Sequence, residues 1–139
     1  MRVMMNKLLP LLLLTPIASG SMGVFHTPPI PDKPKEISEI VTMTTYTVER
    51  SQTDSNPFET ASGMILDKKN PAKHRVVAVS RDLKGTFAFG DSILIVAGNY
   101  SGIYYVEDVM NKRFKKKIDL LINPQDKNTK LYNVKITKL

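Results

Sequence analysis

Two aspartates lie where hydrophobic runs of the sequence predict β-strands. Asp108 ends the run Gly-Ile-Tyr-Tyr-Val-Glu-Asp, and Asp119 lies between Ile118 and Leu120. Aspartate is depleted in strands, so each of these positions needs a specific reason. The two aspartates are eleven positions apart, and the segment between them carries five positive charges: Lys112, Arg113, Lys115, Lys116 and Lys117. This pattern fits a catalytic carboxylate pair, a binding site or a solvated surface.

A pair of carboxyl groups can perform acid–base chemistry on a substrate. A carboxyl group that protonates a leaving group needs a raised pKa, which burial or a neighbouring carboxylate provides. Asp108 and Asp119 could share one groove in this way, with one protonated and the other ionised. The structural alternative is that Asp108 caps loop amides and Asp119 ties a loop by hydrogen bonds. The basic loop, residues 112–117, is either a solvated turn or a contact for carboxylates or phosphates.

Other kinds of catalytic site have little support in the sequence. The chain has no cysteine, which removes thiol nucleophiles and disulfides, and its two histidines are His26 and His74. Two distant histidines without cysteine partners do not supply the ligand set of a zinc site, so we expect no metal and no cofactor. Ser80, His74 and Asp82 have the residue types of a hydrolase triad, but no nucleophile elbow surrounds the serine, and we reject that interpretation.

The elements that must position the aspartates are all predicted to be strands. Six short runs rich in β-branched residues are separated by turn signals, at residues 41–48, 75–80, 92–96, 102–108, 117–122 and 131–137. No segment has a sustained helical period, although residues 58–67 and 123–130 could each contain a helical turn. We therefore predict an all-β fold, a small closed barrel of six strands with one or two helical turns, because closure removes unpaired strand edges.

The 139-residue chain divides into three predicted parts. Residues 1–20 have the positive start, the apolar stretch of about eleven residues and the small residues of a secretory signal peptide, and the stretch is too short to span a bilayer. Residues 21–40 form an extended linker with four prolines between Pro28 and Pro34. Residues 41–139 form the barrel domain. We therefore expect an exported protein, either periplasmic or extracellular and associated with the cell wall.

Charge and composition narrow the possible partners. Removal of residues 1–20 lowers the formal net charge from +7 to +5. A modestly basic exported protein can meet an anionic envelope polymer or a membrane surface. Aromatic residues are few and tryptophan is absent, so no platform for stacking nucleic-acid bases is expected. We expect no nucleic-acid partner, no stable membrane insertion after signal cleavage, and a monomer.

Four motifs in order along the chain resemble the three-aspartate (3D) domain family. They are residues 44–47 (TTYT), residues 60–63 (TASG), residues 77–80 (VAVS), and the pair Asp108 and Asp119 with the family's eleven-residue spacing. The resemblance covers residues 41–139. It implies a double-psi β-barrel related to rare lipoprotein A and to the C-terminal domain of membrane-bound lytic transglycosylase A.

What the resemblance implies about function is chemistry on peptidoglycan glycan strands. In a lytic transglycosylase, a carboxylic acid protonates the glycosidic oxygen between N-acetylmuramic acid and N-acetylglucosamine. It then acts as a base while the C6 hydroxyl closes an anhydro ring. By this resemblance Asp108 is the expected general acid/base and Asp119 the second catalytic carboxylate. The alternatives are a non-catalytic module that binds wall glycan, and an exported structural or phage-derived particle component.

The sequence departs from the family pattern at two places. Ser80 stands where the family has its first aspartate, and Asp82 follows two positions later. Residues 109–112 (VMNK) replace the family's Gly-Gly, and their bulk should narrow or reshape the groove. The expected substrate-binding residues are Tyr46, Thr60, Ser62, Ser80 and Asp82.

Overall fold

The computed structural model describes residues 25–49 and 56–139. The predicted signal peptide, residues 1–20, lies outside the described residues. Residues 25–34 are extended and exposed. A separate compact unit covers Lys35–Leu139 and contains every strand of the fold.

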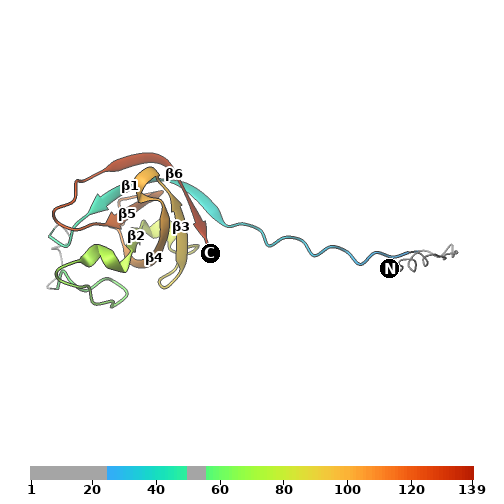
Figure 1. Cartoon of the computed structure of the whole chain (residues 1–139), viewed down its shortest axis with the longest axis horizontal. Coiled ribbons are helices and arrows are strands. Elements are labelled where there is room, and N and C mark those ends of the chain that lie inside the picture. Colours follow the sequence, from blue (N-terminus) through green and yellow to red (C-terminus); the bar gives the residue numbers. More distant parts are fainter. Residues whose placement is uncertain (1–24, 50–55) are drawn as a thin grey trace, which may run out of the picture. The chain divides into compact units, whose positions relative to one another are not determined.

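Six strands make up this unit (Figure 1): β1 (Ser38–Tyr46), β2 (Val76–Val79), β3 (Ser92–Val96), β4 (Gly102–Val109), β5 (Lys117–Leu121) and β6 (Lys130–Lys138). They close into a barrel in the order β1-β5-β2-β4-β3-β6. The predicted all-β fold, a small closed barrel of six strands, is confirmed. Two neighbouring pairs are parallel, β1 with β5 and β2 with β4, and the other four are antiparallel.

The strand limits follow the predicted runs with differences at the ends. β3 occupies the predicted residues, whereas β1 begins at Ser38, three positions before the predicted start. The extra residues are in the strand because they pair with β6, with Ser38 opposite Thr137.

The predicted positions of the helical turns were wrong. The described helical elements are three 3-10 turns, η2 (Pro71–His74), η3 (Arg81–Leu83) and η4 (Gly98–Tyr100). Residues 58–67 instead contain an isolated β-bridge between Glu59 and Ile65. Side-chain acceptors such as Thr60 Oγ1, which bonds the Met64 amide, stabilise this tight turn without a helix. None of the helical elements in the described ranges is long and apolar enough to cross a membrane.

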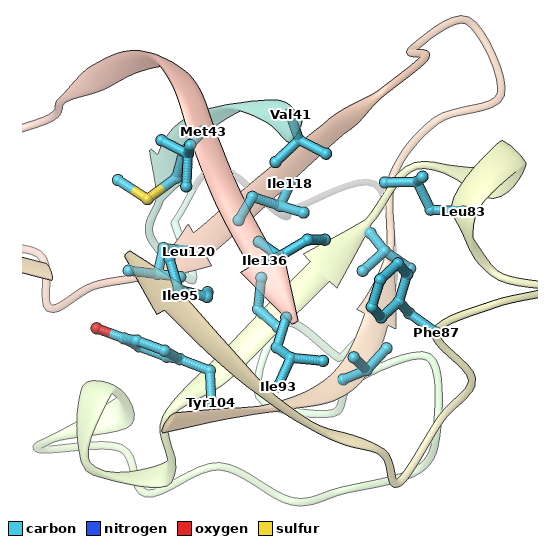
Figure 2. Close-up of a cluster of buried hydrophobic side chains, with 14 of the residues drawn as sticks. Val41, Met43, Leu83, Phe87, Ile93, Ile95, Tyr104, Ile118, Leu120 and Ile136 are labelled. Atoms are coloured by element: carbon cyan, nitrogen blue, oxygen red, sulfur yellow. The ribbon is translucent and has the colours of Figure 1, made fainter. Parts of the chain in front are cut away.

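The barrel interior is filled by alternate residues of the strands (Figure 2). Ile93, Ile118 and Ile136 have no exposed surface and come from three different strands. Phe87 reaches the same cluster from the segment between η3 and β3 and is also fully buried. The residues between these inward positions face outward, and the candidate site is built from them.

Candidate functional site

A row of four outward-facing residues crosses four neighbouring strands. Thr44 of β1 pairs with Asp119 of β5, Asp119 pairs with Ala78 of β2, and Ala78 pairs with Asp108 of β4. Asp119 and Ala78 each lie between two residues of the buried core, so their side chains point to the outer face of the barrel. The two aspartates thus flank one small residue. Their backbones are two strand spacings apart, roughly 10 Å.

A β-bulge in β4 brings Asp108 into this row. Val77 pairs with Val106, but the next residue, Ala78, pairs with Asp108, so Glu107 is the extra residue on β4. Without the bulge, Glu107 would lie opposite Ala78. Bulges of this kind redirect side chains and are frequent beside functional sites.

The outer face at this row is hollowed into a cavity of about 440 Å³. Eleven of the described residues line it: Thr44, Thr45, Tyr46, Ala78, Asp108, Val109, Met110, Asn111, Arg113, Phe114 and Asp119. The strands form its floor, and residues 110–114 form a wall. Because Ala78 has only a methyl group, it leaves space between the two carboxylates.

Three hydrogen-bond donors among the described residues hold Asp108. The Tyr46 hydroxyl donates to Oδ2 at 3.1 Å, and the amides of Ala61 and Val109 donate to Oδ1 at 3.2 and 3.0 Å. A carboxylate offers about four lone-pair positions, so three donors leave one for a ligand. The aspartate is therefore fixed in orientation and still able to accept another hydrogen bond.

Tyr46 is suited to remain a donor at all ordinary pH values. Burial raises the pKa of Tyr46 well above its usual value, and the charge of Asp108, the hydrogen bond to Asp108 and the charge of Asp119 raise it further. The hydroxyl therefore keeps its proton beside the carboxylates. The ring of Tyr46 packs against a second small hydrophobic cluster, which includes the buried Leu121.

Asp119 receives a hydrogen bond from its neighbour in the row. The Thr44 hydroxyl donates to Oδ1 of Asp119 at 2.9 Å. The backbone of Asp119 is held on both sides, because β5 pairs with β1 at Thr44 and with β2 at Ala78. The structure thus brings three of the predicted site residues, Tyr46, Asp108 and Asp119, into one cavity.

Thr60 and Ser62 are not among the described residues that line the cavity, and they lie in a turn that contacts β4. The Thr60 hydroxyl lies 3.0 Å from that of Ser62, and it also accepts the Met64 amide at 3.1 Å. Ser62 donates a hydrogen bond to the carboxylate of Glu107, and its amide bonds the Glu107 carbonyl. These contacts dock the turn onto the β4 bulge and aim the Ala61 amide at Asp108.

Ser80 and Asp82 hold the basic loop, and neither is among the described residues that line the cavity. The fully buried Ser80 accepts the Lys117 amide at 3.1 Å, and Asp82 accepts the Lys116 amide at 3.0 Å. The strand ends at Val79, so Asp82 lies in the η3 turn. Burial works to raise the pKa of Asp82, but hydrogen bonds from the Ser80 hydroxyl and the Lys116 amide lower it more.

The wall of the cavity is an ordered turn. The Asn111 side chain accepts the Arg113 amide at 3.0 Å, and the Asn111 carbonyl accepts the Phe114 amide at 3.0 Å. Arg113 and Lys117 each place their charged group 4.7 Å from the centre of the Phe114 ring. At the start of the wall, the Met110 amide bonds the Val79 carbonyl at 2.9 Å. Met110, Asn111, Arg113 and Phe114 thus build a wall for the pocket.

Eight of the eleven lining residues were not among the expected site residues: Thr44, Thr45, Ala78, Val109, Met110, Asn111, Arg113 and Phe114. Two kinds of signal existed for them. Arg113 and Phe114 lie in the basic loop that the sequence marked as a possible contact, and Ala78 is the one small residue in the otherwise β-branched strand Val76–Val79. In the part of the chain that the structure describes, no group of three or more His, Cys, Asp and Glu side chains could hold a metal ion.

Comparison with models of known protein families and with curated proteins finds no match for this chain.

Proposed function

We propose that this chain acts on the glycan strands of peptidoglycan as a lytic transglycosylase. The observation that carries the proposal is that Asp108 and Asp119, from different strands, line one cavity on either side of Ala78. A cavity of about 440 Å³ is of the size that small-molecule sites commonly have. The carboxylates, hydroxyls and side-chain amide of its lining residues can form hydrogen bonds with sugar hydroxyls.

In the proposed reaction, Asp108 donates a proton to the glycosidic oxygen as the bond from C1 of N-acetylmuramic acid breaks. The resulting carboxylate then takes the proton of the C6 hydroxyl while that oxygen bonds to C1. The products are an N-acetylglucosamine end and a 1,6-anhydro ring, and no water is consumed. Asp119 stabilises the positive charge that develops on the sugar, and Tyr46 orients Asp108.

A second candidate function is binding of wall glycan without cleavage. It is favoured by one feature of the site, namely that all three described partners of Asp108 donate hydrogen bonds to it. This arrangement suits a carboxylate that accepts sugar hydroxyls. Under this alternative the cavity serves as a binding groove of an exported, wall-associated protein.

One experiment separates the two functions. The purified protein is incubated with peptidoglycan, and the soluble products are examined for anhydro-muropeptides by mass spectrometry. We expect such products from the native chain, and their loss in Asp108→Asn and Asp119→Asn. The control is Asp67→Asn, which lies on a turn outside the cavity and should retain activity. Co-sedimentation with wall sacculi without any product would instead support the binding function, and absence of both would reject the proposal.

A further inference from the structure

The cavity carries charges of opposite sign on its floor and its wall. The floor contains Asp108 and Asp119, and the wall contains Arg113. Within residues 25–49 and 56–139, no carboxylate lies within ion-pair distance of Arg113. Its charge is therefore available to a ligand in the cavity.

The position of Arg113 is set by contacts within the wall. Its amide is bonded to the Asn111 side chain, and its guanidinium lies 4.7 Å from the centre of the Phe114 ring. Lys117 contacts the same ring, and the Lys117 amide is bonded to Ser80. A side chain that is ordered before binding loses less conformational entropy when it pairs with a ligand.

The other cations of the basic loop differ from Arg113. Lys116 pairs with Glu39 at 2.6 Å. Lys112 and Lys115 are exposed and are not among the residues that line the cavity. Arg113 is therefore the loop cation that faces the ligand, and Lys112 provides a control with the same charge in the same loop.

The two charges restrict the chemistry of the ligand. A ligand with only hydroxyl groups satisfies the floor but leaves Arg113 without a partner. A simple anion pairs with Arg113 but is repelled by the carboxylates of the floor. A sugar that carries a carboxylate satisfies both, with its hydroxyls on Asp108 and Asp119 and its anionic group on Arg113.

We propose that the pocket selects a carboxylate-bearing sugar and that Arg113 is the residue that determines this specificity. The inference rests on the proposed function, because it places a wall glycan in this cavity. On such a glycan the carboxylate comes from the lactyl group of muramic acid or from an attached peptide. A nucleic acid also combines sugars with anions, but its repeated phosphates would meet the acidic floor.

The test measures dissociation constants by calorimetry for three forms of one disaccharide, N-acetylglucosaminyl-N-acetylmuramic acid. In the first form the lactyl carboxylate is free, in the second it is a methyl amide, and in the third it carries a short peptide that ends in a carboxylate. We expect a charged form to bind about tenfold more tightly than the neutral amide. The tighter of the two charged forms identifies the source of the carboxylate.

Arg113→Gln should reduce the affinity for the charged form to that for the amide, whereas Lys112→Gln should preserve the preference. Equal affinity of the native protein for all three forms would overturn the inference and leave the proposed function standing. Equal losses in Arg113→Gln and Lys112→Gln would also overturn it, because they would indicate a diffuse charge effect. Absence of binding to every form would reject both the inference and the proposed function. Tighter binding of a short oligonucleotide, lost in Arg113→Gln, would replace the sugar with a nucleic acid and overturn the inference.

Discussion

Ser80 accepts a hydrogen bond from the backbone amide of Lys117 at 3.1 Å, and its own amide donates to the Lys117 carbonyl at 2.9 Å. This reciprocal contact joins the end of strand β2 to the end of the basic loop, residues 112–117. Ser80 therefore holds one end of the loop that carries Arg113 and Phe114.

Replacement of Ser80 by alanine should loosen this loop. The Lys117 amide would lose its acceptor in a partly buried position, which we expect to lower the free energy of unfolding by about 1–3 kcal/mol. Affinity for wall glycan should fall as well, because Arg113 and Phe114 lose their support. Urea unfolding and co-sedimentation with sacculi measure the two effects.

The matched control is Ser101→Ala, which removes a hydroxyl that accepts the Ala97 amide at 2.8 Å at a site outside the cavity. It should lower stability by a similar amount without changing affinity. Equal losses of affinity in both variants would contradict the role assigned to Ser80.

A larger side chain at position 78 should fill the space between the two carboxylates of the pocket. A valine there adds two methyl groups between Asp108 and Asp119, at a position that is 5% exposed. We expect at least a tenfold loss of glycan affinity, with a decrease in stability of about 1–3 kcal/mol from overpacking. Ala88→Val, at an exposed position, should change neither. Unchanged affinity in Ala78→Val would show that ligands bind elsewhere.

Removal of the Tyr46 hydroxyl tests whether the orientation of Asp108 matters. Tyr46→Phe keeps the ring in its hydrophobic cluster and removes the 3.1 Å hydrogen bond. We expect a stability loss of about 1 kcal/mol and a severalfold loss of activity or glycan affinity. Tyr105→Phe, an exposed ring on the same barrel, should behave as the native protein. An equal response of the two variants would remove Tyr46 from the site.

Acid should destabilise the fold in part through Asp67. Hydrogen bonds from the Lys73 side chain and from the Asn70 and Lys69 amides lower the pKa of Asp67 to about 2. Because the folded pKa lies below the unfolded value of about 3.9, this stabilisation is complete above pH 4 and is lost as the pH falls towards 2. Urea unfolding at pH 7 and at pH 2.5 measures it.

Asp67→Asn should show a smaller decrease in stability between these pH values than the native protein. The control is Asp32→Asn in the extended segment, for which the described structure gives no contact, and its pH response should equal that of the native chain. If the stability of Asp67→Asn decreased between pH 7 and pH 2.5 as much as that of the native protein, Asp67 would not contribute to the acid sensitivity.

Local sequence signals account for much of the barrel. β3 was predicted at its observed limits because turn residues flank it on both sides. The first three residues of β1 were missed because nothing local distinguishes them from the extended segment before them. Their strand conformation depends on pairing with β6, which is distant in sequence. Such pairing cannot be predicted from the residues around Ser38 alone.

The same distinction applies to the site. Asp108 and Asp119 were predicted because aspartates within strands contradict the usual propensity. Thr44 and Ala78 contradict no local rule, and their role arises from the cross-strand register. The bulge at Glu107, which brings Asp108 opposite Ala78, is likewise a property of the pairing between two strands.

The insertion of β5 between β1 and β2 has a consequence for the order of assembly. Thr44 and its partner Asp119 are 75 positions apart in the chain, and β1 and β2 both precede the strand that separates them. Folds dominated by such distant contacts form slowly, because loop closure must precede the gain from pairing. A chain that has formed only its first strands has neither the floor nor the wall of the pocket. Binding of any ligand in this pocket would therefore report completed closure of the barrel, and a ligand present during refolding should favour the closed form alone.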